Sequence, residues 1–186
     1  LIPQDALVLI CPDGWKFGNM TTKAPETWII LGASSTIARA FAKICTHTQS
    51  KLILAGRDES DIKRTAADIR ISNGVDVDVL FLDAEKTDNH AVFAEQCVSL
   101  AKGQINIFLA FAHLSSYCPD DCNFEDTRRM VNVNYLGVIS VLSRLAPHLE
   151  RQGTGIVIAI GSVAGERGRW KTPVYTSSKA ALHTYL

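Results

Sequence analysis

Three polar side chains near the end of the sequence have types and a spacing that suit acid–base chemistry. Ser162 lies thirteen residues before Tyr175, and Lys179 follows Tyr175 by four residues, in the stretch SVAGERGRWKTPVYTSSK. A phenol, with an ordinary pKa near about 10, is a poor acid–base catalyst at neutral pH. A lysine ammonium one helical turn away favours the phenolate. A serine at the end of an apolar run can hold a carbonyl oxygen beside that phenol, so the pattern predicts one active site.

The elements that would position these residues are indicated by apolar runs alternating with helical patterns. The apolar runs span residues 27–31, 51–55, 75–82, 105–112 and 155–160. The helical patterns span 36–46, 58–70, 89–102 and 126–150, and another begins near Tyr175. Strands that are apolar throughout and alternate with helices are typical of a parallel sheet covered on both faces. We therefore predict a doubly wound α/β fold with three α/β/α layers.

The domain organisation is expected to be simple. Residues 27–186 contain no repeat and no low-complexity linker, so we predict one domain. Residues 1–26 are expected to be an N-terminal extension or leader. The sequence stops within a helical pattern, so we expect a domain truncated at its C-terminus. Leu182 and Leu186 would then be left without cover.

Composition and charge exclude several function classes. Of the 186 residues 47% are hydrophobic, and 19 Lys and Arg balance 19 Asp and Glu. A balanced charge favours neither nucleic acid nor an anionic membrane as partner, and no apolar run approaches the length of a transmembrane helix. Five cysteines without the spacing of a disulfide framework favour a cytoplasmic location. His113, Cys118 and Cys122 lie close together but do not match a zinc pattern, so no metal is expected.

A dinucleotide site is indicated at the first two strand ends. In a doubly wound fold, ligands bind beyond the carboxyl ends of the strands. The first turn, GASSTIAR, keeps one glycine of the usual three, Gly32, and offers the hydroxyls of Ser34, Ser35 and Thr36. A glycine allows a tight turn, and the following helix N-terminus attracts phosphate. A purely structural turn remains the alternative.

The end of the second strand bears on cofactor choice. An NAD enzyme of this fold places an acid there for the ribose hydroxyls, but this sequence has Gly56 followed by Arg57. A guanidinium can grip a 2′-phosphate bidentately. Asp58 or Glu59 could turn toward the ribose if the strand ended later, but both fit better as the first turn of the next helix, where acids suit the dipole. Asp83, after the third strand, could bind an adenine amino group or cap the next turn.

Together these motifs resemble the short-chain dehydrogenase/reductase family from about residue 27 to residue 186. The Tyr-x-x-x-Lys pair falls on Tyr175 and Lys179, the family's serine on Ser162, and its active-site asparagine on Asn134 in NVNYLGV. The strand-four motif reads AFAH (110–113), in which only Ala112 matches. The resemblance implies a Rossmann fold, a nicotinamide cofactor and a carbonyl or alcohol substrate, and the Gly56-Arg57 pair favours NADP(H) over NAD(H). The predicted cofactor-binding residues are Gly32, Ser34, Ser35, Thr36, Ile37, Arg57, Asp83, Ala112, Tyr175 and Lys179.

The resemblance also implies a role for each catalytic residue. Tyr175 would pass a proton to the substrate oxygen, and Ser162 would hydrogen-bond that oxygen. Lys179 would lower the pKa of Tyr175 and bind the nicotinamide ribose, and Asn134 would hold a water linking Lys179 to solvent. A homodimer or homotetramer is expected through the helices at 126–150 and from Tyr175 onward.

Two other classes stay open on the sequence alone. One is a non-catalytic dinucleotide-binding sensor, against which the four matched residues argue. The other is a sugar-nucleotide epimerase or dehydratase, which shares Tyr-x-x-x-Lys, although Asn134 and the Gly56-Arg57 pair favour the reductase. Arg167 and Arg169 either line the mouth of the active site or are ordinary surface arginines.

Overall fold

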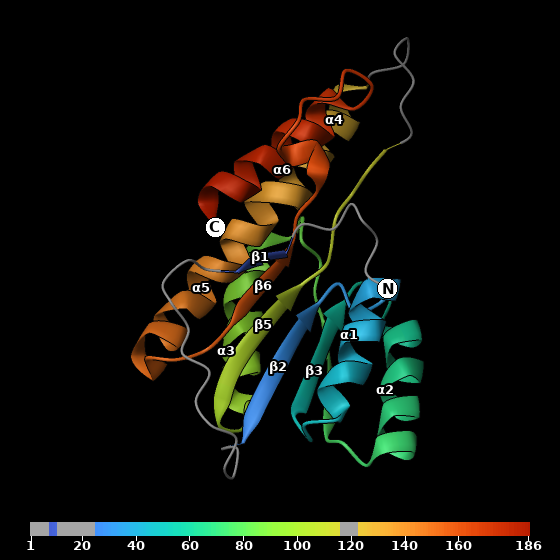
Figure 1. Ribbon diagram of the computed structural model, residues 1–186, viewed down its shortest axis with the longest axis vertical. Coiled ribbons are helices and arrows are strands. Elements are labelled where there is room, and N and C mark those ends of the chain that lie inside the picture. The colour runs from blue at the N-terminus through green and yellow to red at the C-terminus, as the bar shows by residue number, and fades with distance from the viewer. Residues whose placement is uncertain (1–7, 11–24, 116–122) are drawn as a thin grey trace.

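The computed structural model describes residues 8–10, 25–115 and 123–186 (Figure 1). The strands are β1 (Val8–Ile10), β2 (Glu26–Leu31), β3 (Lys51–Gly56), β4 (Val77–Phe81), β5 (Gln104–Leu109) and β6 (Val157–Ile160). The α-helices are α1 (Thr36–Thr46), α2 (Glu59–Asn73), α3 (His90–Leu100), α4 (Phe124–Val131), α5 (Gly137–Gln152) and α6 (Pro173–Tyr185). Two short 3₁₀ segments, η1 (Thr87–Asn89) and η3 (Val163–Gly165), and a π-helical segment, η2 (Asn132–Leu136), complete the order.

The strands form one sheet in the order β1-β6-β5-β2-β3-β4. The five strands from β2 to β6 are parallel, which confirms the predicted sheet. The sixth strand, β1, pairs antiparallel with β6 and sets Val8 opposite Ile160. Part of the predicted N-terminal extension therefore lies in the sheet, which sequence reasoning did not anticipate.

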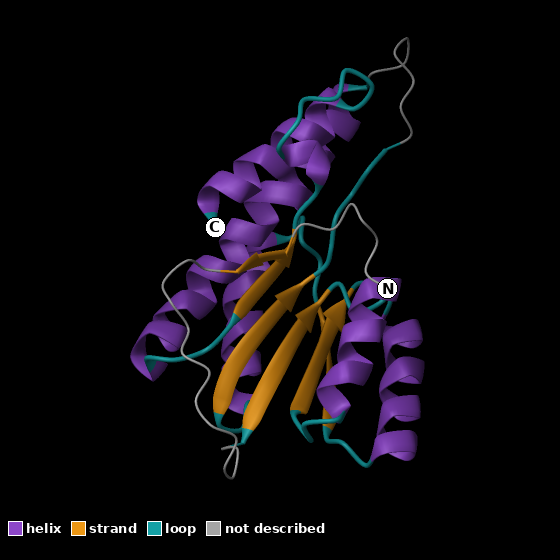
Figure 2. Ribbon diagram, viewed as in Figure 1, coloured by secondary structure: helices purple, strands orange, loops and turns teal. Residues whose placement is uncertain are grey.

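Helices cover both faces of the sheet (Figure 2), and the burial of the β2 side chains explains why. Ile29 and Leu31 are buried in a core shared with α3 and α5, whereas Trp28 and Ile30 are buried in a second core shared with α1 and α2. Successive side chains of a strand point to opposite faces, so a strand buried on both must be apolar throughout. The predicted three-layer α/β/α architecture is thereby confirmed.

Two predicted elements differ from the observed ones. The run at 105–112 is a strand only to Leu109, the last residue of β5 that pairs with β2 and β6. The helix predicted at 126–150 is divided into α4, η2 and α5. Both differences lie at the carboxyl ends of the strands, where Ala110 and Val133 line a cavity.

The C-terminal leucines also correct an expectation. Leu182 is fully buried in the core shared with α3 and α5, and Leu186 packs against that core partly buried. The last helix therefore does have cover for these two side chains. The cover comes from the core on the α3 and α5 side of the sheet.

Candidate active site

A cavity of about 270 Å³ lies beyond the carboxyl ends of β2, β3, β4 and β5. Six of the predicted cofactor residues line it, namely Gly32, Ser34, Ser35, Arg57, Asp83 and Ala112. Thr36, Ile37, Tyr175 and Lys179 are not among its lining residues. Sequence reasoning did not select the other lining residues, which are Gly56, Asp58, Leu82, Ala84, Ala110, Phe111 and Val133.

The first turn is shaped by a close approach of two chain segments. Gly32 has φ +80°, and a Cβ at this position would lie 2.7 Å from the backbone nitrogen of Phe111. Only glycine tolerates both the positive φ and the contact. Ser35 caps α1, because its hydroxyl oxygen accepts a hydrogen bond from the backbone N–H of Ala38 at 3.1 Å. The turn is thus structural at Gly32 and still opens the α1 N-terminus to the cavity.

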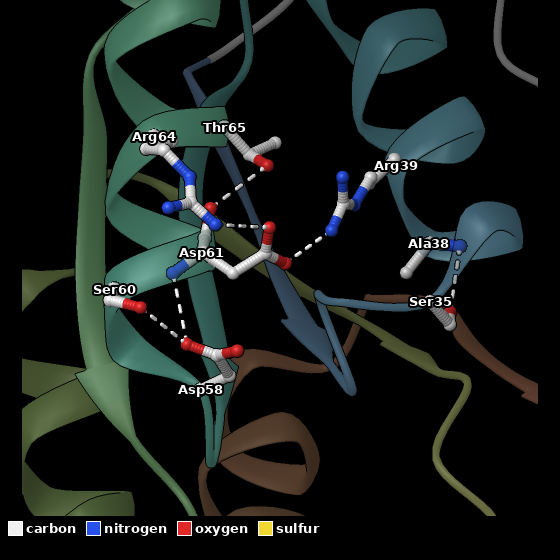
Figure 3. A network of polar contacts seen from close by, with 8 residues as sticks. All are labelled: Ser35, Ala38, Arg39, Asp58, Ser60, Asp61, Arg64 and Thr65. Atoms are coloured by element: carbon white, nitrogen blue, oxygen red, sulfur yellow. Dashed lines mark hydrogen bonds and ion pairs between the residues drawn. The ribbon is translucent and has the colours of Figure 1, made fainter.

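The acids after β3 are engaged by α2 (Figure 3). Asp58 caps that helix, and its Oδ1 accepts from the N–H of Asp61 at 3.0 Å and from the hydroxyl of Ser60 at 2.8 Å. The hydrogen bond from the Asp61 backbone, followed by that from Ser60, lowers the pKa of Asp58. Glu59 pairs with Lys63 at 2.7 Å. The predicted helix start at these acids is confirmed, although Asp58 also reaches the cavity wall.

A buried histidine fixes the loop after β4. Asp83 Oδ1 accepts from the N–H of Glu85 at 3.1 Å, so this side chain does cap a turn, and it also lines the cavity. The carbonyl oxygen of Asp83 lies 2.9 Å from Nε2 of His90, whose Nδ1 lies 3.0 Å from the hydroxyl of Ser140. A carbonyl only accepts, so Nε2 is the donor to Asp83. Sequence reasoning did not select His90, and a lone histidine at a helix start gives little signal.

The π-helical segment η2 presents Asn134 to two neighbouring segments. Its Oδ1 accepts from the N–H of His113 at 2.7 Å, while its Nδ2 donates to the carbonyl of His113 at 2.9 Å and to the hydroxyl of Ser178 at 3.1 Å. The asparagine is fully buried. π-Helical turns inside α-helices are frequent at functional sites. Asn134 thereby joins the chain after β5 to α6.

Close packing at Gly137 accompanies this π-helical turn. A Cβ on Gly137 would lie 2.3 Å from the carbonyl oxygen of Ala84, which belongs to the cavity wall. The helix can approach the loop after β4 only because residue 137 lacks a side chain. Val133, one residue before Asn134, lines the cavity as well. The turn that carries Asn134 is therefore continuous with the cavity.

One face of helix α6 is hydrogen-bonded to the end of β6. Lys179 Nζ donates to the carbonyl of Ile160 at 3.1 Å, and the N–H of Ser162 donates to His183 Nε2 at 3.4 Å. Tyr175, Lys179 and His183 follow each other at intervals of four, so they share that face. The structure thus brings three of the four predicted catalytic residues to the β6–α6 junction, with Asn134 linked to it through Ser178.

The electrostatics of this face are governed by burial. Lys179 is 2% exposed, and desolvation lowers its pKa from 10.5 to about 8. Its Nζ lies 6.0 Å from the centroid of the Tyr175 ring. The hydroxyl of Ser162 accepts from the N–H of Ala164 at 3.2 Å, which leaves its own proton available to another acceptor. The arrangement can hold a carbonyl oxygen at Ser162 and deliver a proton from Tyr175.

Other sequence features carry less information. Cys118 and Cys122 lie outside the described residues, so the cluster with His113 is not described as a whole. Within the described ranges, no group of three or more His, Cys, Asp or Glu side chains is placed to hold a metal ion. No helix in the same ranges is both long and apolar enough to cross a membrane.

The family model described as short chain dehydrogenase matches residues 26–186. The chain therefore belongs to the short-chain dehydrogenase family. It is 28% identical over 157 residues to an uncharacterized oxidoreductase of Staphylococcus saprophyticus, covering 84% of this chain and 67% of that protein. An uncharacterized oxidoreductase of Bacillus subtilis is also 28% identical, and here the match covers 83% of this chain but 44% of the relative.

Solved structures share the fold. A short-chain dehydrogenase from Sphingobium yanoikuyae in complex with NADPH superposes with a TM-score of 0.76 and 25% identity, covering 84% of this chain and 60% of that one. The chain thus spans less than two thirds of that structure and of the Bacillus protein.

Proposed function

We propose that the chain is the cofactor-binding and catalytic part of an oxidoreductase that interconverts a carbonyl compound and an alcohol with NADP(H). One observation carries the proposal. The phenol of Tyr175 and the buried ammonium of Lys179 share the face of α6 that is hydrogen-bonded to the end of β6, where Ser162 lies. A phenol beside a buried cation and a hydroxyl is an arrangement suited to proton transfer at a carbonyl oxygen.

The cavity fits a dinucleotide at its adenosine end. The α1 N-terminus and the hydroxyls of Ser34 and Ser35 suit a pyrophosphate, and Asp83 keeps one carboxylate oxygen for an adenine amino group. Val133 and Ala112 of the cavity wall are the chain neighbours of Asn134 and His113, and Asn134 is hydrogen-bonded to His113 and to Ser178 of α6. When bound, the nicotinamide would supply or accept the hydride. The NADPH complex of the Sphingobium relative is in keeping with such a cofactor.

The protein's own residues then divide the acid–base work. Ser162 would donate a hydrogen bond to the substrate oxygen and fix its position. Tyr175 would give that oxygen its proton as negative charge develops there. The positive charge of Lys179 would stabilise the resulting phenolate. Asn134 would act by holding η2, the segment at residue 113 and α6 together through its hydrogen bonds. Its link to a water is a prediction from the resemblance.

The preference for NADP(H) rests on the end of β3. Arg57 is exposed on the cavity wall, and the acids that could oppose a 2′-phosphate are already engaged, Asp58 as a helix cap and Glu59 with Lys63. A homodimer or homotetramer, a cytoplasmic location and a single domain over residues 27–186 remain predictions from the sequence.

The test is Tyr175→Phe. Loss of the proton donor is expected to lower kcat by at least about a hundredfold, the usual contribution of general acid catalysis. NADPH affinity should change little, because Tyr175 does not line the cavity beyond β2 and β3 in which the adenosine would bind. Retention of most of the wild-type rate would exclude the assigned role. Tight cofactor binding without turnover by the wild type would instead favour a dinucleotide sensor.

A further inference from the structure

We propose that the loop between η3 and α6 binds an anionic group of the substrate, a phosphate or a carboxylate, through Arg167, Arg169 and Lys171. The inference rests on the proposed function and narrows its substrate class. The loop, ERGRWKT (166–172), begins four residues after Ser162 and ends three residues before Tyr175. Its side chains are therefore tethered between two residues of the proposed active site.

The base of the loop is fixed to the same face of α6 that carries Lys179. A Cβ on Gly165 would lie 2.7 Å from the Cε1 atom of His183 and 3.0 Å from the backbone carbon of Lys179. The N–H groups of Glu166 and Arg167 both donate to the carbonyl of Val163 at 3.1 Å. On the exit side, the N–H of Thr172 donates to the carbonyl of Arg169 at 3.1 Å. The loop is a turn of defined geometry at the β6–α6 junction.

Within the described part of the chain, the charge of the loop is not neutralised by ion pairs. Arg167, Arg169 and Lys171 are exposed, and among the described residues none of them has a carboxylate within ion-pair distance. The only acid of the loop is Glu166, so three positive charges face one negative in a chain whose net charge is zero. In contrast, α4, which packs against α6, pairs Arg128 with Glu125 and Arg129 with Glu85. The loop thus keeps a local positive field beside the reacting groups.

The residue types suit an anion with an apolar neighbour. Guanidinium groups bind phosphate and carboxylate bidentately, which gives direction as well as attraction. Trp170 is 75% exposed on the same loop, and Lys171 Nζ lies 5.4 Å from the centroid of its ring. The indole ring is thus an apolar neighbour of one cation of the loop. The ligand class that fits the guanidinium groups is a phosphate or carboxylate anion.

The cofactor's own phosphates do not account for these cations. The cavity beyond β2 and β3, lined by Gly32, Ser35 and Arg57, includes no residue of the loop 166–172. A pyrophosphate at the α1 N-terminus and a 2′-phosphate at Arg57 are therefore served without it. The remaining anion that a reductase would bring to the β6–α6 junction belongs to its substrate.

The test measures anion binding separately from turnover. The full chain is saturated with NADP⁺, which fills the cofactor's phosphate sites and reports whether the dinucleotide binds at all. Inorganic phosphate or acetate is then titrated at constant ionic strength while tryptophan fluorescence is followed. Arg167→Ala/Arg169→Ala is compared with Arg144→Ala, an exposed arginine of α5 that has no described ion pair. Trp170→Phe identifies the reporting ring.

We expect a saturable fluorescence change in the wild type and in Arg144→Ala, with affinity at least tenfold weaker in the double variant. Tighter binding of phosphate than of acetate would assign a phosphate group, and the reverse order a carboxylate. No saturable change, or equal affinity in the double variant, would overturn the anion site while leaving the proposed function intact. Failure to bind NADP⁺ would instead count against the proposed function, and the phosphate titration would still report on the loop.

Discussion

A single side chain, Arg57, carries the proposed choice between NADPH and NADH. Its neighbour Asp58 is acidic and also reaches the cavity, so residue type alone leaves the choice open. The hydrogen bonds that Asp58 accepts from Ser60 and Asp61 favour the proposed choice, because they hold the carboxylate toward α2. Both bonds go to Oδ1, so Asp58 could bind a ribose hydroxyl only through Oδ2 and from the orientation that the cap fixes.

Arg57→Ala is therefore expected to weaken the preference for NADPH. A charge-assisted bidentate contact contributes about 1.5–3 kcal/mol, which corresponds to roughly ten- to hundredfold in the ratio of kcat/KM for NADPH to that for NADH. The measurement compares both cofactors in the wild type and the variant, with Lys43→Ala as a control on the far end of α1. A wild type that prefers NADH, or an unchanged ratio in the variant, would show that Arg57 has no such role.

At the scale of elements, the hydrogen bond that joins α6 to the end of β6 is expected to make the candidate active site sensitive to acid pH. Burial, followed by the nearby positive charge of Lys179, lowers the pKa of His183, whereas Glu166 acts in the opposite direction. The neutral ring accepts a hydrogen bond from the N–H of Ser162, and the protonated ring cannot. Since the folded state binds this proton less readily than the unfolded state, stability falls as pH drops below the ordinary value of 6.5.

We expect kcat/KM to fall on the acid side as His183 gains its proton. His183→Gln keeps an acceptor that does not titrate, so it should retain activity within a few-fold at pH 7 and lose part of the acid limb. His183→Ala leaves the Ser162 N–H without its partner and should lower kcat at every pH. The measurement is the pH profile of kcat/KM for the three proteins. An acid limb identical in wild type and His183→Gln would disprove the link.

The elements themselves differ in how far sequence could predict them. The bounds of α1 were predicted correctly, because Ser35 caps its start and the apolar period is regular to Thr46. The division of residues 124–152 into α4, η2 and α5 was not predicted, since contacts distant in sequence accompany it: Asn134 with His113, and Gly137 with Ala84. β1 is only three residues long and pairs with a strand at the other end of the chain. Local pattern carries no signal for such pairings.

The residues of the candidate site also differ in how far sequence could predict them. Tyr175, Lys179 and Ser162 were predicted from spacing, because a helical turn and a strand end translate directly into sequence intervals. His90, Ser178 and His183 were missed, although each holds a functional segment by a hydrogen bond. Supporting residues of this kind depend on which elements meet in space. Sequence intervals do not reveal that when the partners lie 21 or 44 residues apart.

At the scale of the whole molecule, the burial of Lys179 in the candidate site lowers the stability of the fold. Its pKa falls from 10.5 to about 8 in the folded state, so between these values the unfolded chain holds more protons than the folded one. The free energy of unfolding contributed by Lys179 therefore rises with pH across that window. Cys97 opposes it, because burial raises its thiol pKa to about 12 and the folded state then holds more protons above pH 9.0.

The comparison of wild type with Lys179→Met isolates the lysine. Both proteins share Cys97 and every other titrating group, so their difference in unfolding free energy changes with pH only through residue 179. From pH 7.5 to pH 10, the wild type should gain about 2 kcal/mol relative to Lys179→Met, given about 1.4 kcal/mol per pKa unit. Urea unfolding at the two pH values measures the gain. A constant difference would mean that Lys179 keeps an ordinary pKa in the folded protein. Lys179 would then give the Tyr175 phenol no electrostatic environment different from that of an exposed tyrosine.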